Sequence, residues 1–258
     1  MYRGLPIGTA APTPDELAAA PHHFVGQLSL TDYYSAALFE EQALSLLETL
    51  FAENPMQILC GGSMMYVDAL CRGIDRLPTV SDPIRRRVLD FYNERGLEAI
   101  RAWLAELDPE YFSQVDLNNP KRIIHAIEIC LEAGQPYSSL RTGQQKPRPF
   151  RIVKVALDYP REQIFERINL RVDRMIADGL EQEALSVYPQ RHLNSLNTVG
   201  YKEMFALFDG QMDRQTAIAR MAKNTRVYAK KQLTWLRRDP EVHWLNPSTA
   251  FDDILALL

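Results

Sequence analysis

The sequence predicts an α/β fold with a parallel sheet and an inserted helical subdomain. A helix, a short apolar run closed by Gly61-Gly62-Ser63 and a second helix follow one another before residue 76. Strand composition returns near residue 150, while residues 77–149 show helical periodicity and no convincing strand. Because helices alternating with strands are typical of parallel sheets, we expect residues 1–76 and 150–258 to form the core and 77–149 to be the insertion.

The first part of the core contains two predicted helices and one predicted strand. Pro14-Asp15-Glu16 opens a short helix over 13–20, in an otherwise loop-like segment of 30 residues. Apolar residues recur at helical spacing over 35–53, where Ser35 is the expected N-cap and Asn54-Pro55 the end. Residues 56–60 are the predicted strand, and 64–70 continue as a helix.

The remaining elements are read in the same way. The insertion has three predicted helices, over 82–94, 97–107 and 119–133. The core resumes with a strand over 150–157 and a helix over 160–178, which Gly179 ends. The last predicted elements are helices over 180–188, 200–208, 213–237 and 248–257 and a strand over 242–245.

Composition excludes several classes of protein. The chain has 258 residues, 29 Lys and Arg against 33 Asp and Glu, and a formal net charge of -4. A globally basic nucleic-acid binder is therefore excluded, although a local basic patch is not. The 3 widely spaced cysteines indicate neither a disulfide framework nor a zinc ribbon, and no apolar stretch is long enough for a membrane helix. We expect a cytoplasmic protein without membrane contact.

The segment from Arg220 to Arg238 is the most informative. It holds seven cations and no acid, namely Arg220, Lys223, Arg226, Lys230, Lys231, Arg237 and Arg238. On a helix these lie opposite a face formed by Ile218, Met221, Thr225, Tyr228, Gln232 and Trp235. The pattern favours phosphate binding, because Lys and Arg supply the sequence-independent part of nucleic-acid affinity. The alternative is a solvated helix face.

Two smaller basic groups lie in the predicted insertion. Arg85-Arg86-Arg87 stands at a helix start, against the preference of the helix dipole, and Lys121-Arg122 begins another helix. Each is a weak signal alone. Together they are consistent with two lobes that hold one polyanion.

Arg171 is a candidate for anion binding in the helix over 160–178. Arg167 lies one turn earlier, so the two like charges repel modestly. A diphosphate would relieve the repulsion and accept bidentate hydrogen bonds. The alternative is that Glu166 or another carboxylate pairs with Arg171.

Other motifs are weak or missing. The turn at Gly61-Gly62-Ser63 has the features of an anion-binding helix N-terminus, but no G-x-x-x-x-G-K-[ST] loop occurs in these residues. His22-His23 and the other histidines lack metal-ligand spacing, so a packed or hydrogen-bonded role is favoured. Nothing indicates covalent hydrolysis.

These segments in this order resemble the tRNA dimethylallyltransferase, or tRNA isopentenylpyrophosphate transferase, family. The resemblance runs almost end to end. It is carried by Tyr2 to Ala10, Pro21-His22-His23, Tyr34-Ser35, Gly61 to Tyr66, Asn119-Pro120-Lys121-Arg122, Arg167 to Gly179, Val199 to Glu203, Thr225-Arg226 and Ala229 to Trp235.

The resemblance implies a P-loop nucleoside-kinase-like core and transfer of a dimethylallyl group from dimethylallyl diphosphate to N6 of the adenosine 3′-adjacent to the tRNA anticodon. It implies nucleotide (ATP) binding, Mg²⁺ assisting the leaving group, a monomer, and an insertion that contacts the anticodon stem-loop. Arg171 looks like the diphosphate-binding arginine. The positions similar to tRNA contacts are Tyr2, Ser63, Arg85, Lys121, Arg122, His125, Asn197, Gly200, Tyr201, Lys202, Arg226, Lys230, Lys231, Gln232, Thr234 and Arg237.

The sequence also departs from the family pattern. The family's phosphate loop and the Asp that acts as general base precede the motif with which this chain begins, and neither is in these residues. His125 stands where Arg is usual and Ser63 where Thr is common. We therefore expect a truncated sequence with low or absent activity. The alternatives are a non-catalytic tRNA-binding protein and a small-molecule phosphotransferase.

Overall fold

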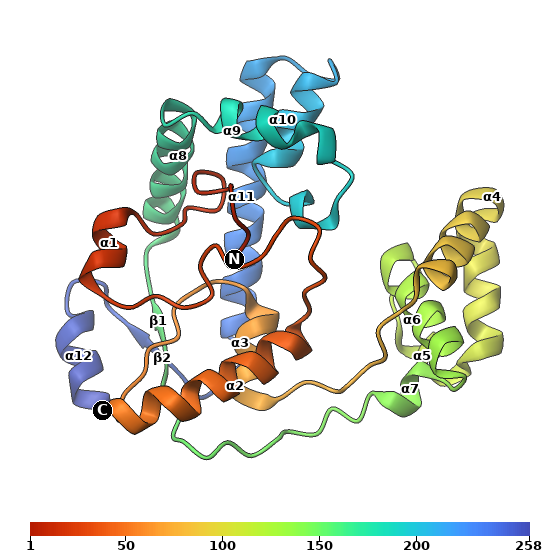
Figure 1. Ribbon diagram of the computed structural model, residues 1–258, viewed down its shortest axis with the longest axis horizontal. Coiled ribbons are helices and arrows are strands. Elements are labelled where there is room, and N and C mark those ends of the chain that lie inside the picture. The colour runs from red at the N-terminus through yellow and green to blue at the C-terminus, as the bar shows by residue number, and fades with distance from the viewer. The chain divides into compact units, whose positions relative to one another are not determined.

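The chain forms two compact units. The structure, a computed structural model, describes all 258 residues. Unit 1 comprises Met1–Tyr34 and Arg151–Leu258, and unit 2 comprises Ser35–Phe150 (Figure 1). Residues 35–76 thus belong to the same compact unit as 77–150. The predicted division into a core of 1–76 and 150–258 and an insertion of 77–149 stays a prediction.

Unit 1 contains a two-stranded parallel sheet. Strands β1 (Lys154–Leu157) and β2 (Val242–Leu245) pair in register from Lys154 opposite Val242 to Leu157 opposite Leu245, side by side in Figure 1. Helices form the connection between them, as parallel pairing requires. These are α8 (Arg161–Ala177), α9 (Leu180–Val187), α10 (Tyr201–Phe208) and α11 (Arg214–Leu236). Short 3₁₀ turns at Tyr188–Gln190 and Asn194–Leu196 lie between α9 and α10.

The core of unit 1 lies among these helices. Its fully buried members include Leu180, Leu196, Tyr201 and Met204, and Leu5 of the N-terminal segment joins them. Gly179, at φ 101°, allows the sharp turn between α8 and α9. The N-terminal segment also carries α1 (Pro14–Ala19), and the chain ends in α12 (Ala250–Leu257).

Local signals explain where most helices begin. Thr13 and Glu16 form a reciprocal capping box at α1. In the same way Ser35 caps α2 (Ala36–Glu53), and Asp213 caps α11 through the backbone N–H of Thr216. The helices predicted over 13–20, 35–53, 160–178 and 213–237 are confirmed to within a residue or two.

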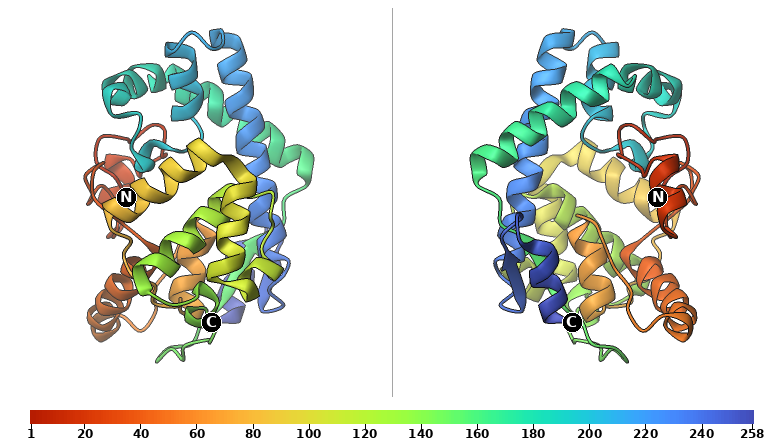
Figure 2. Two further views of the ribbon diagram at one scale, coloured as in Figure 1. Left: turned by 90° about the vertical axis from the view of Figure 1, so that its right-hand side faces the viewer. Right: turned by 90° about the vertical axis from the view of Figure 1, so that its left-hand side faces the viewer.

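Unit 2 is helical throughout. Helices α2 and α3 (Met64–Arg72) pack together, and α4 (Asp82–Leu107) packs along α6 (Pro120–Ala133), as Figure 2 shows. Gly96, at φ 76°, interrupts α4, which agrees with two predicted helices over 82–94 and 97–107. The short helices α5 (Pro109–Gln114) and α7 (Tyr137–Leu140) were not predicted. The core of this helical group includes Val88, Ile100, Leu104, Ile123 and Ile127.

The strand predicted over residues 56–60 is wrong. These residues form no strand, and the side chain of Ile58 is 86% exposed. A strand needs a hydrogen-bonded neighbour, and unit 2 contains none. The strand predicted over 150–157 is also shorter, since pairing begins at Lys154. No helix in the structure is both long enough and apolar enough to span a bilayer.

Candidate nucleic-acid interface

Helix α11 carries the predicted basic segment. Its first half is anchored, because Ala217, Met221 and Ala222 are buried in the core of unit 1. Its second half is solvated, with Tyr228 42% and Trp235 37% exposed. The six-residue face predicted opposite the cations is therefore buried only in part, and two of its aromatic residues are partly exposed.

The cations of this half-helix have no acidic partners. Lys230, Lys231 and Arg237 are exposed and form no ion pair in the structure. Arg237 lies over the ring of Trp244, 5.6 Å from its centroid. Thr234 is exposed, and its hydroxyl donates to the carbonyl of Lys230 at 2.9 Å. Gln232 is half-buried. Unpaired cations with exposed rings are the usual composition of a nucleic-acid surface.

Arg226 has a different position from the cations that follow it. Its Nη1 donates to Asn169 Oδ1 at 2.7 Å, and its guanidinium lies 5.7 Å from the centroid of Phe165. Both partners belong to α8, which packs along α11 (Figure 2). The predicted tRNA contact at Arg226 is thus half-buried and holds α8 against α11.

The two arginines of α8 differ in their partners. Arg167 donates to the hydroxyl of Tyr159 at 3.0 Å and stacks on its ring at 4.6 Å. Arg171 is exposed and forms no ion pair, so the alternative pairing with Glu166 is not present. Ile168 and Val172 are buried, and Arg171 lies at the edge of their face with its guanidinium available to an anion.

The segment from Asn197 to Lys202 divides into exposed and buried residues. Asn197 and Lys202 are exposed. Tyr201 is 0% exposed, and its hydroxyl donates to Glu183 Oε1 at 2.6 Å. Burial and Glu183 both raise the pKa of Tyr201, so this hydroxyl stays a proton donor. The ring of Tyr201 lies in the core and its hydroxyl is already bonded, and the predicted contact between Tyr201 and tRNA stays a prediction.

Gly200 also has a structural role. It is buried at φ 99°, and its N–H donates to Glu203 Oε2 at 2.7 Å. Asn224 of α11 donates to the other oxygen of Glu203 at 2.7 Å. Glu203 thus fixes the start of α10 against α11. The backbone N–H of Gly200 is already bonded, and the predicted tRNA contact at Gly200 stays a prediction.

The N-terminal segment is held to unit 1 by hydrogen bonds. Tyr2 is half-buried and forms an isolated bridge with Leu28, and burial followed by the charge of Asp32 raises its pKa. The backbone N–H groups of Ile7 and Gly8 donate to the two oxygens of Glu183 at 2.8 and 2.7 Å. These contacts fix the first ten residues of the chain within unit 1.

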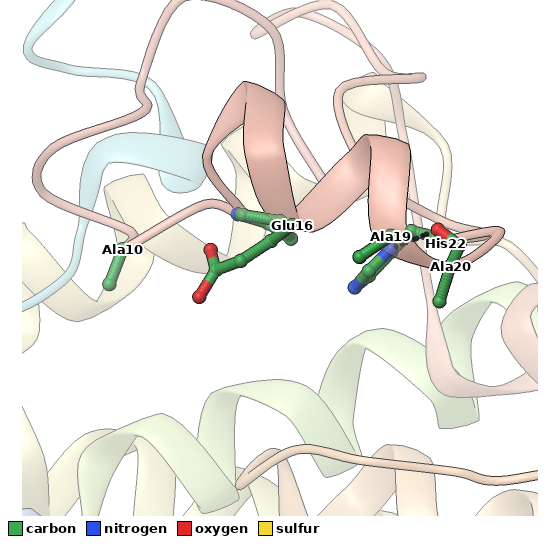
Figure 3. A pocket seen from close by; sticks show the side chains of 6 residues that line it. Ala10, Glu16, Ala19, Ala20 and His22 are labelled. Atoms are coloured by element: carbon green, nitrogen blue, oxygen red, sulfur yellow. Dashed lines mark hydrogen bonds between the residues drawn. The ribbon is translucent and has the colours of Figure 1, made fainter.

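The same segment contains a shallow hollow, shown in Figure 3. It is lined by Ala10, Pro12, Glu16, Ala19, Ala20 and His22. Nδ1 of His22 lies 2.8 Å from the carbonyl oxygen of Ala20, and Glu16 is engaged in the capping box. The hydrogen-bonded role predicted for His22 is confirmed, and both polar groups of the hollow are already used.

In unit 2, Ser63 stands at the start of α3. Its side chain is exposed and forms no cap hydrogen bond, while its carbonyl accepts the first helical N–H groups. The hydroxyl of Ser63 is therefore available to a ligand.

The other predicted contacts of unit 2 gather on α4 and α6. Asn119 caps α6, whose first turn presents exposed Lys121 and Arg122. The side chain of His125 is 51% exposed, with Nδ1 4.0 Å from Glu128. Burial and the nearby charge of Arg85 lower the pKa of His125. His125 is thus neutral at pH 7, which weakens phosphate contact there.

Sequence analysis missed Arg141, which lies beside this group. Its guanidinium stands over the rings of Tyr111 and Tyr137, at 5.3 and 5.5 Å. No local motif marks it, because Tyr111 is 30 residues away in the sequence. The sequence shows only that Arg141 follows Tyr137 by four residues, and this spacing alone does not predict a binding site.

The structure contains no cluster of three or more His, Cys, Asp or Glu side chains that could hold a metal ion.

Comparison with protein families gives one consistent result. The model of the family described as IPP transferase matches residues 1–239. The chain is 54% identical over 247 residues to tRNA dimethylallyltransferase 1 of Phocaeicola vulgatus, covering 96% of this chain and 82% of that protein. It is 50% identical to tRNA dimethylallyltransferase 2 of Porphyromonas gingivalis, covering 100% of this chain and 86% of that one.

Solved structures show the same likeness. The tRNA isopentenylpyrophosphate transferase of Bacillus halodurans is 32% identical, with a TM-score of 0.66 over 95% of this chain and 78% of that chain. A eukaryotic dimethylallyltransferase acting on tRNA has a TM-score of 0.73 over 95% of this chain and 64% of that chain. At 22% identity it supports the fold alone. The structure has the α/β, kinase-like fold of these neighbours.

Proposed function

This chain belongs to the IPP transferase family of tRNA dimethylallyltransferases, and on that premise we propose that dimethylallyl diphosphate is its prenyl donor. The acceptor is N6 of the adenosine 3′-adjacent to the anticodon. In the reaction the C1–O bond to diphosphate breaks as the N6–C1 bond forms, and N6 loses a proton to a general base. No residue of this chain is assigned that base.

The second half of α11 is the observation that carries the proposal. In a chain of net charge -4, it presents Lys230, Lys231 and Arg237 without acidic partners and Trp235 partly exposed. Such a surface selects a polyanion over a small neutral substrate, because phosphate contacts supply most of the affinity. Arg85, Lys121 and Arg122 of unit 2 supply the same chemistry for the anticodon stem-loop.

Arg171 serves the diphosphate of the donor. Its guanidinium is exposed, unpaired and planar, which suits bidentate contact with phosphate oxygens. The free hydroxyl of Ser63 offers a further donor for tRNA. Mg²⁺ and ATP binding and a monomeric state are also expected of the family. We place the protein in the cytoplasm, where its tRNA substrate is made.

The test is prenyl transfer by the purified chain. It is incubated with dimethylallyl diphosphate, Mg²⁺ and unmodified tRNA, and the digested nucleosides are analysed by mass spectrometry. A tRNA with guanosine beside the anticodon is the matched control. Product from the adenosine tRNA alone supports the proposal. Salt-sensitive binding of tRNA without product would instead favour a non-catalytic tRNA-binding protein.

The Arg171→Gln variant tests the assignment at the donor end. Because Gln lacks charge and the guanidinium fork, we expect a higher KM for dimethylallyl diphosphate and unchanged tRNA affinity. Arg174→Gln, another exposed arginine of α8, is the control. Equal effects of both variants on KM would contradict the assignment.

A further inference from the structure

Arg141 lies on an aromatic platform in unit 2. Its guanidinium is 5.3 Å from the ring centroid of Tyr111 and 5.5 Å from that of Tyr137. The two rings meet edge to face, with centroids 4.8 Å apart. A cation within about 6 Å of a ring face is attracted to it. The two rings hold the side chain of Arg141 in place. Arg141 is exposed and forms no ion pair in the structure, so no acid in contact with it neutralises its charge.

A buried carboxylate fixes the platform. Asp108 is 0% exposed and accepts the backbone N–H of Tyr111 at 2.9 Å. It also accepts the N–H and the hydroxyl of Ser138, at 2.6 and 2.7 Å. Because Ser138 adjoins Tyr137, one carboxylate positions both rings. Arg141 therefore loses little side-chain entropy when a ligand binds, as its orientation is already restricted.

The platform continues the basic surface of the helical group. The ring of His125 lies 5.8 Å from that of Tyr137. Burial raises the pKa of Tyr137, whereas the charges of Arg141 and Arg122 act in the opposite direction, which places both arginines near this ring. Arg85 lies near His125, because its charge contributes to the lowered pKa of that ring.

Three acids lie near this surface. The carboxylate of Asp75 accepts from the hydroxyl of Thr142 and the N–H of Gly143, and it lies within electrostatic range of Arg141. Glu128 is mostly buried beside His125. Asp108, buried at the platform, is the third acid, and its oxygens are already bonded to Tyr111 and Ser138. The arginines at positions 85, 122 and 141 are all exposed.

We propose that Arg141, held against Tyr111 and Tyr137, is a further RNA-binding residue of unit 2 that contacts a backbone phosphate of bound tRNA. The inference rests on the proposed function. Stacking occupies the face of the guanidinium and leaves its N–H edges for phosphate oxygens. The contact positions the RNA and takes no part in the reaction.

The experiment measures tRNA affinity of the full chain as a function of salt for the wild type, Arg141→Gln and Arg141→Lys. Arg141→Gln is expected to weaken binding by about 3- to 10-fold and to make the log–log salt slope shallower by about 0.7 to 0.9, the loss of one phosphate contact. Arg141→Lys keeps the charge but loses the fork, so we expect weaker binding with the original slope.

Arg95→Gln is the matched control. Arg95 is an exposed arginine of the same helical group, ten residues along α4 from Arg85 and hence about 15 Å away along the helix axis. Thermal melts show whether each variant folds. If Arg141→Gln melts early, the comparison of Arg141→Lys with the wild type decides, and equal affinities overturn the inference.

The outcomes separate the two proposals. If the wild type binds tRNA in a salt-dependent way and Arg141→Gln behaves like Arg95→Gln, the inference is overturned and the proposed function stands. If the wild type neither binds nor prenylates tRNA, the proposed function fails and the inference fails with it. A loss confined to Arg141→Gln supports the inference.

Discussion

Glu183 connects two segments that lie far apart in the sequence. One oxygen accepts the N–H of Gly8 and the hydroxyl of Tyr201, and the other accepts the N–H of Ile7. A Cβ at Gly8 would lie 2.4 Å from the Tyr201 ring, so only glycine permits this approach. Tyr201, which resembles a tRNA contact of the family, thus has a structural role in this fold.

Tyr201→Phe tests that interpretation. The variant removes a buried donor to a carboxylate, and we expect the free energy of unfolding to fall by about 1.5 to 3 kcal/mol. The salt slope of tRNA binding should not change, since the hydroxyl is inaccessible. Tyr33→Phe, at a 54% exposed tyrosine, is the control for chemical denaturation. A changed salt slope with unchanged stability would refute the structural role.

His125 predicts a pH dependence of tRNA binding. Burial and Arg85 hold its pKa below the ordinary value of 6.5, and Glu128 and Tyr137 are its other polar neighbours. As pH falls below 6.5, the ring gains a proton and adds a positive charge to the surface. We therefore expect tRNA affinity, measured at constant ionic strength, to rise as pH falls from 7.5 through the lowered pKa of His125.

Two variants isolate this effect. His125→Gln should lose the rise in affinity at low pH. His125→Arg should bind more tightly than the wild type at pH 7.5, with a salt slope steeper by about 0.7 to 0.9, and this difference should shrink as His125 of the wild type gains its proton. A full pH response in His125→Gln would assign the effect to another group.

At the scale of elements, a buried ion cluster joins α2 and α3 to the segment after α7. Glu40 of α2 is 6% exposed and accepts from Arg148 at 2.7 Å, from Lys146 at 3.0 and 3.1 Å, and from the N–H of Ile74 at 3.2 Å. Arg148 also donates to the carbonyls of Ala69 and Leu70 at the end of α3. The segment that leads from α3 into α4 and the segment that follows α7 therefore both bind the carboxylate of Glu40.

Glu40→Gln is expected to lower the free energy of unfolding by about 3 to 5 kcal/mol, because the buried charge of Arg148 is left without a carboxylate partner. Burial alone would raise the pKa of Glu40, but the bonds from Arg148 and Lys146 outweigh it and lower the pKa. This stability is therefore present above the ordinary pKa of 4.5 and is lost as pH falls through the lowered value.

Denaturation of the wild type and Glu40→Gln between pH 3 and 7 checks both statements. Glu98→Gln is the control, because the side chain of Glu98 is 84% exposed in its pair with Arg101 and should contribute about 0 to 1 kcal/mol. If both variants lose the same free energy of unfolding, the stabilising role of the ion cluster at Glu40 is contradicted.

For the whole molecule, charge distribution matters more than net charge. The chain is acidic overall, yet Lys230 and Lys231 near the end of α11 form no ion pair. A bound polyanion therefore contacts local cations while the rest of the surface repels it, so affinity should depend steeply on salt.

The double variant Lys230→Gln with Lys231→Gln measures this contribution. We expect tRNA affinity to fall and the log–log salt slope to become shallower by about 1.4 to 1.8, the loss of two phosphate contacts. Arg214→Gln is the control, since Arg214 begins the same helix and pairs with Glu181. An unchanged slope in the double variant would exclude α11 from the interface.

The sequence by itself determined the family, most helices and the basic face of α11, because capping residues, helical periodicity and ordered motifs are local properties of the chain. Only the tertiary structure decided which of these residues remain available. Tyr201 is buried, and its hydroxyl donates to Glu183. Arg226 donates to Asn169, and Ile58 is exposed without a neighbouring strand. Arg141 meets its tyrosines only because Asp108 brings α5 and α7 together. Burial and pairing depend on partners distant in sequence, which no local pattern reveals.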